Sequence, residues 1–326
     1  MQLDEFLEPR VLIVSGKGGV GKTTVAAALA LVAARHGRTA CIAEVDRKGS
    51  LPRAFDAPVL SYQPKEMSPG VYGMNIVPEE ALGEYLDVQY HMKRISRIFT
   101  STHFVDYITT AAPGLKDILT LGKIWYLEQD RNSRFDTIIV DAPAAGHMLT
   151  FLSAPMGLSD ALRVGPVQRQ AQWLLEMLRD PLRSRVHLVT LPEEMPVVET
   201  METSIALQAR VGITSGAVFA NGVYSPLLSK KESAALVELI ASGDLTTLAT
   251  EAKAAGLNLD DDDMNAIVGY ARFLEARRAI QASHLRILKK GVVEPVVELP
   301  FLFSAGLALP DIENLADVVE EEIAEL

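Results

Sequence analysis

The fold is decided by the stretch Val11-Leu12-Ile13-Val14-Ser15-Gly16-Lys17-Gly18-Gly19-Val20-Gly21-Lys22-Thr23. It opens with an apolar run typical of a buried strand, and residues 24–35, rich in Ala and Leu, predict a helix after it. Between the two, the sequence satisfies the G-x-x-x-x-G-K-[ST] pattern of a phosphate-binding loop. Glycines allow successive backbone N–H groups to curl around a phosphate, and the following helix adds its positive N-terminus. The stretch therefore predicts a nucleotide-binding loop between a strand and a helix.

Two side chains of the loop have expected chemical roles. Lys22 is expected to reach the β- and γ-phosphates as a catalytic group, and the Thr23 hydroxyl is expected to ligate Mg²⁺. ATP is favoured over GTP because the sequence has no Asn-Lys-x-Asp run, the usual guanine reader. The residues of this segment expected to bind the nucleotide are Gly16, Lys17, Gly18, Gly19, Val20, Gly21, Lys22, Thr23 and Thr24.

Short apolar runs recur along the chain, separated by longer segments with helical spacing. Continuous rather than alternating apolar character is typical of strands that are buried on both faces. Their succession with helices predicts an α/β fold with a doubly wound, mainly parallel sheet of about seven strands. The expected strands are Val11–Ser15, Thr39–Val45, Val71–Val77, Thr137–Asp141, Val186–Leu191, Ala217–Asn221 and Val293–Leu299.

We expect residues 1–326 to form a single P-loop ATPase domain with two helical insertions, at approximately residues 79–129 and 226–290. Such insertions either carry partner specificity or pad the core, and the sequence leaves both open. The final segment predicts a helix with Asp311 as its N-cap, followed by apolar residues at helical spacing.

The charge and the hydrophobic pattern of the sequence indicate which partners and which cellular compartment to expect. Lys and Arg number 31 against 42 Asp and Glu, so the net charge is −11 and a diffuse nucleic-acid-binding surface is not expected. The first residues are acidic and have no signal-peptide character. Because no apolar run approaches ~18 residues, we expect a cytoplasmic protein that does not insert directly into a membrane.

Carboxylates that end buried strands are candidates for the metal and water chemistry of phosphoryl transfer. Asp141 closes the apolar run Thr137–Asp141 and is expected to hold Mg²⁺ through a water molecule. Asp46 follows Thr39–Val45 in the same way, and it is expected to position the attacking water and to contact Mg²⁺ through water. Glu44 is an alternative to Asp46, because it would share the same strand face.

Lys17 adds a second lysine to the loop, which a phosphate cradle within one subunit does not need. The run Lys17-Gly18-Gly19-Val20-Gly21-Lys22-Thr23 resembles the deviant Walker A family, which includes MinD, ParA, nitrogenase iron protein and ArsA. This resemblance implies a catalytic Lys17 that crosses a dimer interface to the ATP of the partner. The chain has one such loop, so the resemblance implies a homodimer or a heterodimer with a paralogue.

The run from Ala142 to Leu152 resembles the switch segment of the ArsA branch, which includes the tail-anchored-protein targeting ATPase. Within it, His147 is either a switch residue or a hydrogen-bonded structural histidine. The resemblance further implies that Asn221 contacts adenine and that Pro300 and Phe301 flank the base. It spans almost the whole chain, and it implies an ATPase of the ArsA type.

Several departures limit what this resemblance implies. Cys41 is the only cysteine, so neither the three-thiolate arsenite site nor the zinc-binding Cys-x-x-Cys pair of the family can form within one chain. The usual switch residues are replaced by Arg47-Lys48-Gly49-Ser50, and Ala145 stands where Thr is common. Hydrolysis that is slow or differently gated would follow from these changes.

The expected function is a Mg-dependent ATP-hydrolysing dimeric switch that couples nucleotide turnover to a cargo. The cargo is either an unidentified protein client or a solute moved through a membrane transporter, and a MinD- or ParA-like regulatory ATPase is the alternative. One stripe has the helical spacing of a client face, although burial against the sheet is equally consistent with it. It comprises Tyr85, Val88, Met92, Ile95 and Phe99.

Overall fold

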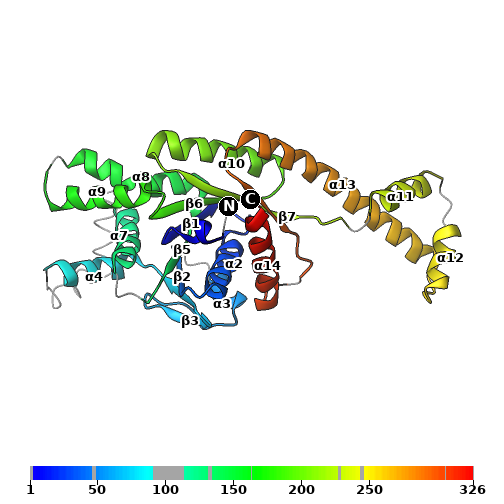
Figure 1. Cartoon of the computed structure of the whole chain (residues 1–326), viewed down its shortest axis with the longest axis horizontal. Coiled ribbons are helices and arrows are strands. Elements are labelled where there is room, and N and C mark those ends of the chain that lie inside the picture. The colour runs from blue at the N-terminus through cyan, green and yellow to red at the C-terminus, as the bar shows by residue number, and fades with distance from the viewer. Residues whose placement is uncertain are drawn as a thin grey trace.

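The computed structural model describes residues 3–45, 49–90, 114–130, 134–162, 164–226, 229–242, 246–304 and 306–325. An eight-stranded sheet forms its centre, in the order β3-β4-β2-β5-β1-β6-β7-β8 (Figure 1). All neighbouring strands are parallel except β3 and β4. The strands are β1 Val11–Gly16, β2 Ala40–Glu44, β3 Lys65–Ser68, β4 Val71–Asn75, β5 Thr137–Ala144, β6 Ser184–Thr190, β7 Ser215–Val223 and β8 Val296–Pro300.

The predicted fold class is confirmed, because all seven expected strands are present and the sheet is mainly parallel. The eighth strand, β3, lies at the edge and pairs only with β4. Its sequence, Lys-Glu-Met-Ser, has no apolar run, since an edge strand is not buried on both faces. Pairing with the neighbouring strand, rather than local sequence, defines it.

Helices cover both faces of the sheet. The described helices are α1 Leu3–Leu7, α2 Lys22–Arg35, α3 Ser50–Ala54, α4 Pro78–Tyr90, α7 Leu115–Gln129, α8 Ala145–Ala161, α9 Pro166–Arg179, α10 Glu194–Ala206, the π-helix η1 Leu207–Val211, α11 Lys230–Ser242, α12 Thr246–Ala254, α13 Asp261–Gly291 and α14 Leu309–Glu325.

Alternate residues of the central strand enter two separate cores. Leu12 and Val14 of β1 pack with α2 and α14 on one face. Val11 and Ile13 pack on the other face, in a core that includes residues of α7, α8, α9 and α13. Because both faces of β1 are buried, its carboxyl end is held rigidly where the glycine loop begins.

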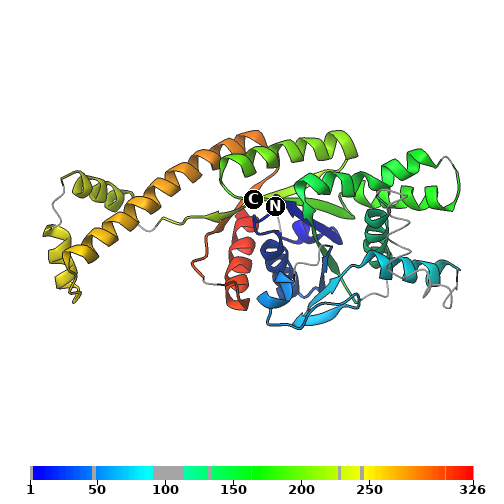
Figure 2. The same ribbon diagram turned by 180° about the vertical axis from the view of Figure 1, so that it is seen from behind.

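Helix α13 forms an arm that leaves the sheet and carries α11 and α12 at its far end, as both views show (Figures 1 and 2). Asp260 caps its N-terminus in a reciprocal capping box with Asp263. At its other end, Leu285 and Leu288 enter the core on one face of the sheet, and α13 packs against α10 and β7. Among the described residues, the arm thus enters this core from its C-terminal half.

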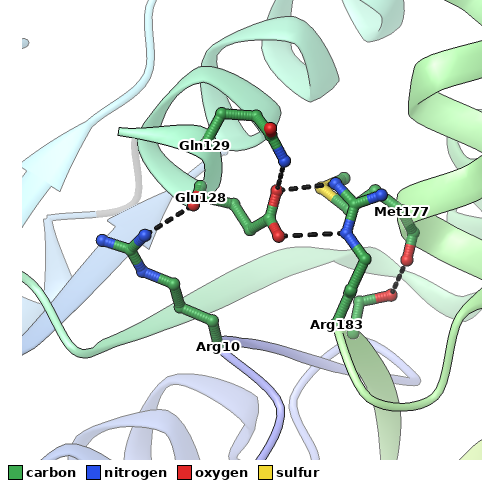
Figure 3. Close-up of polar contacts among 6 residues, drawn as sticks. Arg10, Glu128, Gln129, Met177 and Arg183 are labelled. Carbon is green, nitrogen blue, oxygen red and sulfur yellow. Dashed lines mark hydrogen bonds and ion pairs between the residues drawn. The ribbon is translucent and has the colours of Figure 1, made fainter. Parts of the chain in front are cut away.

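At the amino ends of the strands, opposite the glycine loop, Glu128 links three parts of the chain (Figure 3). Its carboxylate accepts two hydrogen bonds from Arg183, at 3.0 and 2.8 Å, and its backbone carbonyl accepts one from Arg10. The hydrogen bond to Glu128 raises the pKa of Arg183. The end of α7 is thereby fixed against the chain just before β1 and β6.

Helices α4 and α7 lie in the first expected insertion, and α11, α12 and most of α13 lie in the second. Of the expected amphipathic stripe, Met92, Ile95 and Phe99 fall outside the described residues. Within the described part of the chain, the structure contains no helix that combines the length and apolarity needed to cross a membrane.

The expected N-cap of the last helix was wrong. Helix α14 begins at Leu309, so Asp311 lies in its first turn. Its carboxylate reaches back to the backbone N–H of Ala308 at 2.9 Å, while the Ala308 carbonyl accepts from Asp311 and Ile312. A carboxylate in the first turn satisfies a free N–H as well as an N-cap does, and the two are difficult to distinguish from sequence.

Candidate functional site

The candidate site lies at the carboxyl ends of the central strands. Val14 of β1 is aligned with Asp141 of β5, and Asp141 is aligned with Glu44 of β2. From β1 the chain passes to β2 on one side of β1, and from β5 it passes to β6 on the other side, so this is where the strand order reverses. Ligands of open α/β sheets bind in the crevice at such a point.

The loop between β1 and α2 fits a phosphate group. Gly19 and Gly21 have φ angles of 83° and 96°, which favour glycine. A Cβ on Gly18 or Gly19 would meet none of the described atoms within 4 Å, whereas one on Gly21 would lie 2.2 Å from Asn221 Nδ2. Among the described residues, no side chain caps the N-terminus of α2. The N–H groups of that first turn suit an anion.

Lys22 is 5% exposed, although it carries an ammonium group. Its Nζ donates to the backbone carbonyl of Lys17 at 3.0 Å, across the mouth of the loop. A buried lysine is stable only where its charge is compensated. This position places a positive charge beside the N–H groups that would surround a phosphate.

The Thr23 hydroxyl donates to Asp141 Oδ2 at 2.6 Å. Asp141 is 5% exposed, and Thr23 is in the first turn of α2. A hydroxyl and a carboxylate beside a phosphate cradle fit Mg²⁺, which binds few protein oxygens and takes its other ligands from phosphate and water. Two of the three residues predicted to hold the metal, Thr23 and Asp141, are therefore in direct contact.

Asp46, predicted to position water, lies outside the described residues, as do Arg47 and Lys48. Its alternative, Glu44, is 2% exposed and ends β2 next to Asp141. Two buried carboxylates thus lie side by side at the carboxyl edge of the sheet. The competition between Asp46 and Glu44 stays open.

Lys17 extends from the loop to Glu199 on α10, with its Nζ 3.0 Å from a carboxylate oxygen. The side chains are 38% and 33% exposed, so solvent screens the pair and the contact is weak. Lys17 is therefore accessible from outside the subunit. Glu199 has no local signature in the sequence, because only the fold brings α10 next to the loop.

The residues expected to contact adenine lie together. The Asn221 side chain donates to the carbonyl of Val20 at 2.8 Å, which ties the end of β7 to the loop. Pro300 ends β8, and the N–H of Phe301 donates to the Val223 carbonyl at 2.8 Å. Tyr224, which the sequence reasoning missed, stacks on Phe301 with ring centroids 4.8 Å apart.

His147 is exposed in the first turn of α8, and the choice between a switch residue and a hydrogen-bonded structural histidine stays open. Burial raises the pKa of Asp117 on α7, and the charge of the nearby His147 partly offsets that rise. The residue replacing the common Thr, Ala145, is buried at the start of α8. The segment expected to act as a switch thus connects β5 directly to α8.

Cys41 is buried in β2, and burial raises its pKa to about 12. At neutral pH the thiol is protonated, and a thiol must be deprotonated to bind a soft metalloid. Among the described residues, no three His, Cys, Asp or Glu side chains cluster in a geometry for a metal ion.

Comparison with known proteins points to one family. A sequence model of the family described as Anion-transporting ATPase matches residues 9–177. ATPase BagA of Mycobacterium tuberculosis is 32% identical, over 96% of this chain and 93% of that protein. The putative arsenical pump-driving ATPase 1 of Aquifex aeolicus is 23% identical, over 95% and 78%. The arsenical pump-driving ATPase of Escherichia coli is 26% identical, over 71% of this chain and 42% of that protein. With the geometry above, these matches show that the chain belongs to the anion-transporting ATPase (ArsA) family and is an ATP-hydrolysing enzyme.

Proposed function

We propose that the protein is a Mg-dependent, dimeric ATP switch that couples hydrolysis to an apolar cargo segment. The observation that carries this proposal is the Thr23–Asp141 contact of 2.6 Å beside the buried Lys22. It assembles a metal-binding hydroxyl, a carboxylate and a phosphate-binding cation under one glycine loop. These are the groups that phosphoryl transfer requires.

Different residues of the chain bind the phosphates, hold the metal and orient the attacking water. The loop N–H groups and Lys22 bind and orient the phosphates, and Lys22 exchanges the Lys17 carbonyl for phosphate oxygen. Thr23 and Asp141 hold the metal, which when bound neutralises charge on the β- and γ-phosphate oxygens. Asp46, with Glu44 as the alternative, orients the attacking water from β2.

Dimerisation is supported by the position of Lys17. Its side chain points out of the loop, and its ion pair with Glu199 is exposed enough to break at little cost. In a symmetric pair, the Lys17 ammonium would leave Glu199 and approach the γ-phosphate of the partner, as an arginine finger does. Each site would then be complete only when two chains meet.

An apolar pocket supports the cargo part of the proposal. It has a volume of about 260 Å³ and lies between α4, α7, α8 and α9. Its polar groups include Lys123 and Glu84, which neutralise each other at 2.7 Å, so an uncharged occupant is favoured. Tyr85 and Val88 of the expected client stripe line this pocket, together with the stacked Trp125 and Trp173.

The pocket connects to the nucleotide site through one helix. Helix α8 starts directly after β5, which carries Asp141, and Leu158 of α8 lines the pocket. A shift of α8 after hydrolysis would therefore reach the cargo. This continuity favours an apolar protein segment as the cargo. It favours this function over a purely regulatory one, and over one in which a separate transporter moves a solute.

The metal proposal predicts the effect of removing the Thr23 hydroxyl. Thr23→Val keeps the size of the side chain but loses the oxygen ligand, so the Kd for MgATP should rise by about tenfold to a hundredfold. The affinity for ATP in EDTA should change little. Isothermal titration calorimetry measures both values.

Thr23→Ser, which keeps the hydroxyl, is the matched control and should bind MgATP like the wild type. Equal MgATP affinity in Thr23→Val and the wild type would contradict a role for Thr23 in holding the metal.

The dimer proposal predicts complementation between two inactive variants. Lys17→Ala lacks the group offered to the partner, and Lys22→Ala lacks the group for its own phosphates. An equal mixture should recover about a quarter of wild-type ATPase activity, because half of the random dimers contain one complete site. A phosphate-release assay measures this recovery, with each variant alone as the control.

A mixture no more active than the separate variants would show that Lys17 does not act across an interface. So would full activity of Lys17→Ala by itself.

The cargo proposal predicts a fluorescence change. The chain has two tryptophans, and both line the pocket. A 20-residue Leu/Ala peptide with terminal lysines, free of aromatic residues, should shift the tryptophan emission as its leucine side chains enter the pocket. Gly122 also lines the pocket, and a Cβ there would meet no described atom within 4 Å, so Gly122→Leu should fill the space and block the shift. An unchanged spectrum in the wild type, or an equal shift in Gly122→Leu, would refute this assignment.

A further inference from the structure

The carboxyl end of β7 departs from regular strand geometry beside the expected base site. Gly222 has a φ angle of 74°, and the register with β8 shifts between Ala220 and Val223. Two backbone groups there are bound by a side chain instead of a strand. The Tyr224 N–H donates to Gln281 Oε1 at 2.8 Å, and Gln281 Nε2 donates to the Gly222 carbonyl at 2.9 Å.

Gln281 belongs to α13 and is 6% exposed. Its amide supplies one acceptor and one donor to the strand end, as a neighbouring strand would. Buried backbone groups without partners cost free energy, so this side chain compensates for the interrupted ladder. It does so from a helix that is remote in sequence from β7.

The segment that Gln281 holds also carries or contacts the expected base-binding residues. Asn221 precedes Gly222 and donates to the Val20 carbonyl of the loop at 2.8 Å. The Tyr224 ring stacks on Phe301, whose own N–H donates to the Val223 carbonyl. A displacement of residues 222–224 would therefore shift both Asn221 and the Tyr224–Phe301 pair.

We infer that Gln281 is a positioning residue for base recognition, which holds the β7 end so that Asn221 and the Tyr224–Phe301 pair face adenine. This inference rests on the proposed function and on the expected contact of Asn221 with adenine. Gln281 does not touch the nucleotide. The side chain of Gln281 thereby connects the arm helix α13 to the residues expected to contact the base.

If Gln281 positions the base-binding residues, its removal should lower the affinity for the base and leave the affinity for the phosphates unchanged. In Gln281→Leu, which loses both hydrogen bonds, the Kd for MgATP should rise about tenfold. The Kd for magnesium tripolyphosphate should stay within about twofold of the wild type, because residues 16–23 are unaltered. The preference for MgATP over MgGTP should fall. Ser283→Ala, an exposed position on the same helix, is the control and should behave like the wild type.

A conservative variant and a double-mutant cycle keep the test independent of folding. Gln281→Glu keeps the acceptor for Tyr224 and loses the donor to Gly222, so its MgATP affinity should lie between the wild type and Gln281→Leu. In a double-mutant cycle, Asn221→Ala and Gln281→Leu should be less than additive for MgATP, because both act through the same contact with the base. A purely structural role for Gln281 would produce additive losses.

The outcomes distinguish the inference from the proposed function. Unchanged MgATP affinity in Gln281→Leu, or an equal loss for MgATP and tripolyphosphate, would overturn the inference alone. A wild-type protein that binds neither ligand would instead overturn the proposed function.

Discussion

A hydrogen bond from the Thr23 hydroxyl to Asp141 joins the start of α2 to the strand beside β1. The contact requires that β1 and β5 are adjacent and in register, which both cores maintain from opposite faces of the sheet. It also places the buried Lys22 and the N-terminus of α2 on one side of the same crevice. The site proposed here for a nucleotide and its metal would therefore be a consequence of strand order, with local glycine geometry supplying the space.

The same strand order links the nucleotide site to two distant parts of the molecule. Helix α8 leaves β5 and reaches the apolar pocket, so the strand that carries Asp141 and this pocket share a continuous backbone. On the other side of β1, Asn221 ties β7 to the loop, and Gln281 ties β7 to the arm. Changes at the phosphates and at the base thus have separate structural routes, through α8 and through α13.

The features that could be predicted from sequence are those that short segments of the chain encode. The glycine run, its flanking strand and helix, and the apolar strands all have local signatures, and the structure confirmed the fold class. The edge strand β3 could not be predicted, because pairing with β4 defines it. Glu199 and Gln281 were also missed, since a carboxylate or amide on a helix has no signature until the fold brings a partner to it. The role of Lys17 was inferred from a resemblance, and its geometry is compatible with that role.

The central claim, that the glycine loop grips the triphosphate of ATP, is tested most directly by a crystal structure with Mg²⁺ and a non-hydrolysable ATP analogue. The account predicts β- and γ-phosphate oxygens among the N–H groups of residues 16–23, with Lys22 Nζ moved from the Lys17 carbonyl to phosphate oxygen. Triphosphate bound elsewhere, or Lys22 still on the Lys17 carbonyl with the analogue in the loop, would contradict it.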